Sequence, residues 1–280
     1  MSTVINTNVT AIVAQRNLAQ TGVAFGKSVE KLGSGLRINR ASDDAAGLAI
    51  SEKLRSQVKG YNMAVRNVQD GISLAQTGEG ALNEVHGMLQ RMRELAVQAS
   101  NGTLAQADRD AIGQEAKALS DEIDRIATTT KFNGTSLLDS SSTVDILAGV
   151  EGTETIGIAL VDVQVSAIDA ASAITDFADD TAGTVTAAFA TAAITQLDSA
   201  IADVSTARSS FGAVQNRLER ATVSIGVAAE NLAASESRIR DLDVASEMVN
   251  MTKSQILQQA GVAVLAQANQ APAAVLSLLR

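Results

Sequence analysis

Hydrophobic residues recur every seventh position along the C-terminal half of the chain. The series runs through Leu197, Val204, Phe211, Leu218, Ile225, Leu232 and Ile239 without a miss. A spacing of seven keeps side chains on one stripe of an α-helix and is typical of helices that pack along their length. The pattern predicts a helix of roughly 45 residues with one buried stripe.

A second series with the same spacing precedes it, formed by Leu54, Tyr61, Val68, Ala75, Leu82, Leu89 and Ala96. We expect Ser42 to cap this helix, with Asp43 and Asp44 in its first turn, and Asn101-Gly102 to end it. A third helix is expected over about 104–129. Together these helices form a coiled-coil-like rod, and we assign its packing to Leu54, Tyr61, Val68, Phe211, Leu218, Ile225 and Leu232.

The middle of the chain has a different pattern. Alternating apolar residues on both sides of Gly149–Gly152 predict a β-hairpin within about 131–165. Residues 166–189 are rich in Ala, Thr and Asp, and we expect them to form a short, variable surface segment. The rod domain therefore comprises 43–165 and 190–240.

Both ends of the chain also have helical spacing. The N-terminal arm carries Leu18, Phe25, Val29 and Leu32, and the C-terminal arm carries Val249, Ile256, Ala263 and Leu265. Gly33-Ser34-Gly35 is expected to break the first arm from the rod. Because the hairpin turns the chain round, 1–42 and 241–280 should pair as a terminal helical domain. The fold class is mainly α: a long helical rod, paired terminal helices and a small β-hairpin region.

The apolar content of the terminal helices exceeds what one pair can bury, and large exposed apolar patches usually mark an interface. Residues 254–279 lack Lys, Arg, Asp and Glu, and therefore fit either a membrane-spanning helix or a helix buried among protein partners. Six amide side chains in this stretch favour protein partners. A head-to-tail contact that does not close would produce a helical filament.

Composition removes several classes of function. The chain has no Cys and a single His, His86, so neither a thiolate nor a histidine metal site can form, and no cofactor or catalytic residue is expected. The net charge of −9 argues against nucleic-acid binding. No secretory signal peptide is visible at the N-terminus.

Several segments carry a specific resemblance. The sequence from Leu32 to Ile50, Gln90–Gln98, Gly212–Leu218, Ser237–Asp241 and Gln259–Gln270 closely resemble bacterial flagellins. The resemblance implies a short flagellin that is not an enzyme and whose terminal helices line the core of an extracellular flagellar filament. The residues expected to take part in assembly of that core are Leu18, Phe25, Val29, Leu32, Val249, Ile256, Ala263 and Leu265. It also implies secretion through the flagellar type III export apparatus with an export chaperone, and contacts with the filament cap and the hook-junction proteins.

The stretch Gln90–Gln98 permits two interpretations. The general one is a face of the rod that contacts solvent or another subunit. The resemblance implies a more specific one, in which Arg91, Leu95 and Glu115 of the monomer are recognised by the host flagellin-sensing Toll-like receptor.

Three other functions compete with a filament subunit. A junction protein between hook and filament would share the terminal helices but match the central motifs less fully. An adhesin or non-polymerising scaffold would not need an uncharged C-terminal arm. An enzyme ranks last.

Overall fold

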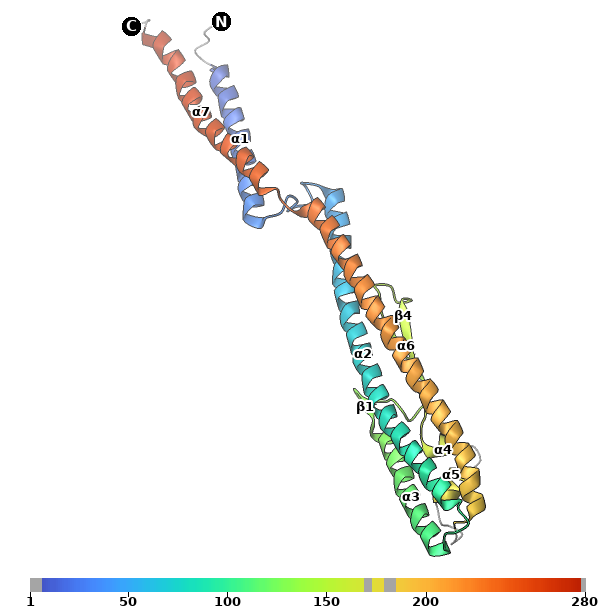
Figure 1. Ribbon diagram of the computed structural model, residues 1–280. Helices are drawn as coiled ribbons and strands as arrows, with labels where there is room; N and C mark the ends of the chain where they lie inside the picture. The colour runs from blue at the N-terminus through green and yellow to red at the C-terminus, as the bar shows by residue number, and fades with distance from the viewer. Residues whose placement is uncertain (1–6, 169–172, 179–184, 278–280) are drawn as a thin grey trace. The chain divides into compact units, whose positions relative to one another are not determined.

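The computed structural model describes residues 7–168, 173–178 and 185–277, and its described part is mainly helical (Figure 1). The chain divides into two compact units. Unit 1 comprises Met1–Val58 and Glu230–Arg280, and unit 2 comprises Lys59–Ala229. The division falls inside the two long helices, α2 (Ala45–Ala99) and α6 (Ala187–Arg240), whereas the sequence analysis placed the domain boundaries at 42 and 241.

In unit 1, helices α1 (Val9–Ser34) and α7 (Val244–Ser277) lie side by side, as Figure 1 shows. They run antiparallel, because Asn8 Nδ2 donates to the Ala268 carbonyl at 2.7 Å while Gly261 lies under Leu18 near the middle of both helices. The expected pairing of the terminal helices is confirmed. Asn8 also caps α1 by accepting a hydrogen bond from the Ala11 amide at 3.1 Å.

Next to these two helices in unit 1, the segment that follows α1 pairs with the segment that precedes α7. Helix α1 ends at Gly35, whose φ of 71° is left-handed, as the Gly33-Ser34-Gly35 sequence predicted. Beyond it, Leu36 and Asp241 form an antiparallel bridge. The Arg37 amide donates to the Arg240 carbonyl at 2.7 Å.

The start of α2 differs from the expectation. Helix α2 begins at Ala45, and its cap is Asp44, whose Oδ1 accepts from the Gly47 amide at 2.9 Å. Ser42 and Asp43 precede the helix. Asp43 instead accepts hydrogen bonds from the Asn39 and Arg40 amides, which closes the preceding turn.

Unit 2 is built on antiparallel packing of α2 and α6. Glu79 pairs with Arg208 at 3.0 Å, and Arg93 pairs with Asp198 at 2.5 Å. Phe211, 1% exposed, lies on the backbone of Gly78. Helix α3 (Gln106–Thr129) returns along α2 and buries Ile112, Ala116 and Ile123 in the same core.

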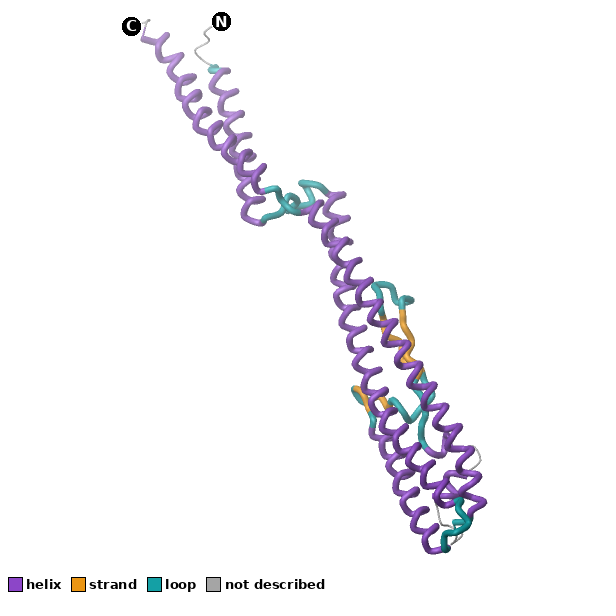
Figure 2. Tube along the Cα trace, viewed as in Figure 1, coloured by secondary structure: helices purple, strands orange, loops and turns teal. Residues whose placement is uncertain are grey.

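Within the described residues, the β region consists of two short antiparallel hairpins, drawn in orange in Figure 2. The first pairs β1 (Lys131–Phe132) with β2 (Thr135–Ser136), and the second pairs β3 (Thr143–Leu147) with β4 (Thr155–Ala159). The β3–β4 hairpin packs against α2, since Ile146 lies over Gly71 and Val150 lies over Gly60. The expected hairpin is confirmed.

The described part of 166–189 is not simply a surface segment. It contains most of α4 (Val165–Ile168) and all of α5 (Ala173–Ala178), and Ile174, Phe177 and Val185 are buried in the core of unit 2. These few large apolar residues are widely spaced in a small-residue segment, so they produce no periodic signal. Residues 169–172 and 179–184 lie outside the described residues.

Candidate functional site

Most of the large aliphatic side chains of α1 and α7 are exposed and lie outside the contact between the two helices. Toward each other the helices present mostly small or polar residues: Ala11, Ala14, Leu18, Thr21, Phe25, Ser28 and Leu32 on α1, and Met251, Ser254, Gln258, Gly261, Leu265 and Ala268 on α7. Both sets alternate steps of three and four, the spacing of a helix-pairing seam. Small residues in the seam let the helix backbones approach closely.

We call the exposed surface of the pair, outside this seam, the outer apolar face. Its exposed members are Val9, Ile12, Val13, Val23 and Val29 on α1, and Val244, Met248, Val249, Ile256, Leu257, Val262 and Val264 on α7. Val249 is 68% exposed and Ile256 is 59% exposed. Monomeric soluble proteins rarely expose so many large apolar side chains on one pair of helices, so this face is the best candidate interface in unit 1.

The residues assigned from the sequence to the terminal helices divide between these two surfaces. Leu18, Phe25, Leu32 and Leu265 are half-buried in the seam. Val29, Val249, Ile256 and Ala263 are exposed. The heptad series on α7 therefore marks the outer apolar face rather than the contact with α1.

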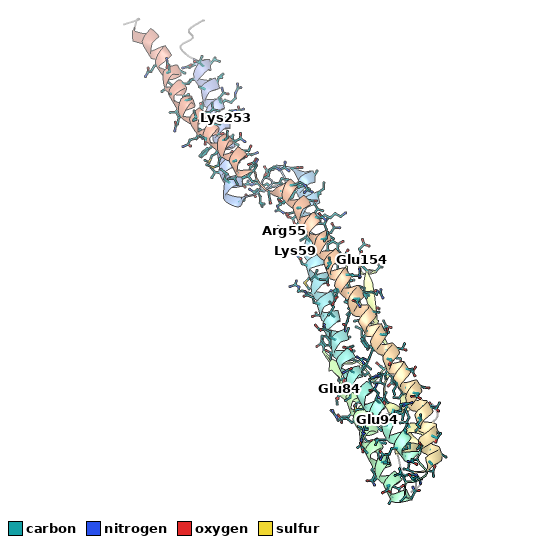
Figure 3. All side chains as sticks on the ribbon, in the orientation of Figure 1. Arg55, Lys59, Glu84, Glu94, Glu154 and Lys253 are labelled. Atoms are coloured by element: carbon teal, nitrogen blue, oxygen red, sulfur yellow. The ribbon has the colours of Figure 1, made fainter. Side chains whose placement is uncertain are left out.

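A shallow recess on α7 lies within the outer apolar face. It is lined by Met248, Val249, Thr252, Lys253, Ile256 and Leu257. Lys253, labelled in Figure 3, brings the only positive charge in α7 to its edge. The recess is almost wholly apolar and holds none of the acid and base pairs that catalysis requires. Within the described residues, no cluster of His, Asp and Glu is arranged to hold a metal ion.

The rod residues assigned from the sequence lie along the inner stripes of α2 and α6. Val68, Phe211, Leu218 and Ile225 are buried in unit 2. Tyr61 is half-buried in unit 2, and Leu54 and Leu232 are half-buried in unit 1.

Arg91 and Glu115 form the centre of a charged cluster on unit 2. The Arg91 guanidinium donates to Glu115 Oε1 at 2.8 Å and 3.0 Å, and to Glu94 Oε2 at 3.1 Å. These hydrogen bonds, the one to Glu115 foremost, raise the pKa of Arg91 above its usual value. Figure 3 labels Glu94 on α2. Arg91 and Glu115 remain about half exposed, Glu94 is 68% exposed, and all three are accessible to a partner.

Leu95 does not belong to this surface. It is 1% exposed and sits in the core of unit 2 with Met92 and Leu89. Sequence spacing placed Arg91 and Leu95 on neighbouring turns, but the inner stripe of α2 includes Leu95 and excludes Arg91. Leu95 is therefore part of the packing of α2, and of the three residues only Arg91 and Glu115 are exposed.

Comparison with known proteins decides the family. The model of the bacterial flagellin N-terminal helical region matches residues 5–143, and the model of the C-terminal helical region matches residues 194–279. The chain belongs to the bacterial flagellin family. It is 51% identical to a flagellin of Halalkalibacterium halodurans over 99% of this chain and 100% of that protein. It is 46% identical to the flagellar filament 33 kDa core protein of Treponema phagedenis, again over 99% and 100% of the two chains.

A solved structure of a putative flagellar hook-associated protein from Vibrio parahaemolyticus is similar in fold. Its TM-score is 0.58 at 16% identity, and the match covers 71% of this chain and 100% of that one. At that identity the likeness concerns the fold alone.

Flagellins are structural proteins that polymerise, so this chain is a subunit of the extracellular flagellar filament and not an enzyme. Among the described helices, none is both long and apolar enough to span a membrane. Of the two interpretations of the uncharged C-terminal arm, burial among protein partners fits the family.

Proposed function

We propose that the outer apolar face of α1 and α7 forms the contacts between subunits at the core of the filament, and that the helices of 43–165 and 190–240 form the surrounding rod. The exposure of Val249 and Ile256 is the observation that carries this proposal. Fully burying one such side chain contributes about 1.5–3 kcal/mol. The twelve exposed large apolar residues of α1 and α7 can therefore offset the cost of immobilising a subunit, which is on the order of 4–15 kcal/mol.

Charge placed on the outer apolar face tests this proposal. In Val249→Asp/Ile256→Asp, two carboxylates would have to be buried without partners, so polymer should not sediment after addition of filament seeds. Helix content measured by circular dichroism should stay that of the wild type, because neither residue lies in the seam with α1.

A matched control adds the same charge at exposed α7 positions that are already polar. Asn250→Asp/Gln267→Glu should polymerise nearly as the wild type does. Normal polymerisation of the Val249/Ile256 variant would contradict the proposal, as would an equal loss in the control.

A second function is supported by the Arg91 cluster. We propose that the free subunit presents Arg91 and Glu115 to the host flagellin-sensing Toll-like receptor. Arg91 lies on α2 and Glu115 on α3. Their ion pair fixes the two side chains, which remain about half exposed. A planar, pre-oriented guanidinium flanked by carboxylates offers directional hydrogen bonds at little entropic cost.

Reporter cells that carry the receptor test this second function. Arg91→Ala monomer should lose potency at least tenfold, since an arginine at an interface centre commonly costs 2 kcal/mol or more, about a 30-fold change. Arg125→Ala is the control, because Arg125 is also exposed and paired with a carboxylate, Glu122, on unit 2. Full potency of the Arg91 variant would overturn the assignment.

We also propose a route by which the filament subunit is exported and assembled. The type III export apparatus and an export chaperone would carry the chain outward, and the filament cap and hook-junction proteins would receive it. The family membership supports these partners. Cells without a working export apparatus should retain the chain inside, and its appearance in their medium would contradict this route.

A further inference from the structure

Two turns of unit 2 contain an Asn-Gly pair. Asn101-Gly102 lies between α2 and α3, and Asn133-Gly134 joins β1 to β2. Each of the other asparagines in the sequence is followed by a residue that has a side chain. Glycine has no β carbon and therefore leaves its own backbone nitrogen the most accessible. The two pairs are the positions where a backbone nitrogen can most readily attack an asparagine side chain.

The reaction is an intramolecular displacement at the asparagine side chain. The nitrogen of the following residue loses its proton and attacks Cγ, so that a C–N bond forms while the bond to Nδ2 breaks and ammonia leaves. Water from the solvent then opens the five-membered succinimide at one of its two carbonyls. The product is aspartate or isoaspartate, in which the backbone continues through Cβ and Cγ. The reaction therefore consumes only water.

Asn133 is held in a conformation that prevents this attack. Its φ is 47°, in the left-handed region, where ψ is typically about +47°. At that ψ the tetrahedral geometry of Cα places Cβ nearly anti to the nitrogen of Gly134, so this nitrogen and Cγ point away from each other. Pairing of Phe132 with Thr135 on the two sides of the turn maintains the conformation. Asn133 is therefore protected as long as the hairpin is folded.

Asn101 is free of this restraint. Among the residues that the structure describes, Asn133 alone combines a side chain with a positive φ, so the φ of Asn101 is negative. At a negative φ, ψ is typically about −42° or about +135°, and either value brings Cβ closer to the next nitrogen than the left-handed conformation does. Asn101 and Gly102 are both exposed, and a β carbon at Gly102 would meet no atom within 4 Å. The Gly102 amide donates no hydrogen bond within the described part of the chain, so solvent can take its proton.

The side chain of Asn101 is also folded toward the nitrogen that would attack it. Its Oδ1 accepts a hydrogen bond from the Thr103 amide at 3.2 Å, an Asx turn that spans the Gly102 peptide unit. The same hydrogen bond draws electrons from the side-chain carbonyl and makes Cγ more susceptible to attack. We propose that Asn101 is a site of spontaneous deamidation in the folded chain, and that the turn at Asn133 suppresses the same reaction.

Deamidation changes the connection between α2 and α3. The Asn101 carbonyl accepts hydrogen bonds from Arg109 Nη2 at 3.2 Å and from the Leu104 amide at 3.4 Å. In isoaspartate the longer backbone shifts the chain that follows position 101, and the Leu104 amide moves with it. Either product also adds a carboxylate at the C-terminus of α2, where the helix dipole disfavours negative charge and Arg109 partly offsets it. The modified turn is therefore weaker than the original one.

The modification accumulates with the age of a subunit. The released ammonia is lost to solvent, so the amide does not re-form, and the modified fraction increases with the time since the chain folded. This inference goes beyond the filament function and is independent of it, because it concerns one turn of unit 2 and requires no second copy. In a filament, old and new subunits would differ at this turn.

Ageing of the purified chain in mildly alkaline buffer tests the proposal. Samples taken over time are digested, and mass spectrometry measures the conversion of amide to acid at both Asn-Gly pairs. In the folded chain, deamidation at Asn101 should be at least about tenfold faster than at Asn133. In urea, where neither turn is folded, the two rates should agree within about twofold. Equal rates in the folded chain would overturn the proposal, as would a tenfold difference that persists in urea.

A substitution of the attacking residue provides a second test. In Gly102→Ala the added methyl group has room and meets no positive φ, so the fold should be kept while access to the nitrogen is reduced. Deamidation at Asn101 should become at least about fivefold slower, and that at Asn133 should not change. Thr103→Ala is the matched control, because it alters the same turn but keeps the Asn-Gly pair and the Thr103 amide. An unchanged rate in Gly102→Ala, or equal slowing in the control, would contradict the proposal.

Isoaspartate at the turn can be detected directly. A carboxyl methyltransferase specific for isoaspartate should transfer methyl groups from S-adenosylmethionine to the aged chain and few to the freshly purified one. The aged Asn101→Gln chain should accept few methyl groups, since attack on glutamine would require a larger ring. Equal labelling of the aged Asn101→Gln chain would place the isoaspartate elsewhere and overturn the assignment. None of these results depends on polymerisation, so they are separate from the Val249/Ile256 experiment.

Discussion

Leu18 of α1 lies directly on the backbone of α7 at Gly261, where a β carbon would stand 3.1 Å from Leu18 Cδ1. This contact shows how the terminal pair is built. Glycine at position 261 brings the two helices close enough for Leu18 to pack, although the surrounding α7 residues are mostly small or polar. Most of the large aliphatic side chains of α7 are thereby left exposed for other partners.

Enlarging the residue at this contact should separate the terminal helices. In Gly261→Leu the new side chain must displace Leu18, while Gly26→Leu is a matched control because nothing lies within 4 Å of a β carbon there. Spin labels at Gln15→Cys and Gln267→Cys should report a longer distance in the first variant only. An unchanged distance in Gly261→Leu would show that the seam is looser than the structure indicates.

Removing the Phe211 ring should destabilise unit 2. Phe211 is buried against Gly78, so Phe211→Ala leaves a cavity and should lower the free energy of unfolding by about 3–5 kcal/mol. Phe189→Ala is the control, since Phe189 is exposed on the same helix and its loss should cost less than about 1 kcal/mol. Urea denaturation followed by circular dichroism measures both. Similar losses would contradict the packing described for Phe211.

The two ion pairs between α2 and α6 should contribute unequally to the free energy of unfolding. Arg93–Asp198 is about half exposed, so Asp198→Ala should cost under about 1 kcal/mol. Arg208–Glu79 is less exposed, and Arg208 Nε already lacks a hydrogen-bond partner, so Glu79→Ala should cost about 1–2 kcal/mol. Denaturation of both variants in low and high salt tests this. A larger loss for Asp198→Ala would reverse the ranking.

Acid should weaken the turn before α2. The amide of Arg40, then that of Asn39, together with the nearby charges of Lys27 and Lys31, lowers the pKa of Asp43 below its usual value, despite an opposing effect of burial. A carboxyl with a lowered pKa in the folded state stabilises that state above its unfolded pKa of about 3.9, and the contribution is lost as pH falls through the lowered value.

Asp43→Asn tests this pH dependence. Exchange of the Arg40 amide with solvent should be faster in the variant at pH 7, and the difference should disappear at the acidic end of the titration, where Asp43 is protonated. A difference that persists unchanged at pH 2 would mean that the Asp43 charge does not hold the turn.

The sequence was most informative where large apolar residues repeat. The series from Leu197 to Ile239 predicted α6, and alternation around Gly149–Gly152 predicted the β3–β4 hairpin. Spacing was least informative where small residues form the contact. On α7 the inward seam contains Ser254, Gln258 and Gly261, which no hydrophobic pattern marks, whereas Ile256 marks the outer face.

The candidate receptor surface shows the same limit. Spacing places Arg91 and Leu95 one turn apart, but a helix packed by both α3 and α6 buries more than one stripe, and Leu95 lies in the buried part. The burial of Ile174 and Phe177 could not be predicted from the sequence either, because isolated apolar residues in a segment of Ala, Thr and Asp form no periodic pattern. To predict that Leu95, Ile174 and Phe177 are buried, one would have to know which helices pack against each other.

Electron microscopy of seeded polymerisation tests the central claim most directly. The purified chain and a chain ending at Lys253, which lacks residues 254–280, are each incubated with short filament seeds under precipitating salt. The complete chain should extend the seeds into long uniform filaments, and the shortened chain should stay monomeric with a folded unit 2. Filaments grown from the shortened chain would contradict the claim that the terminal helices drive assembly.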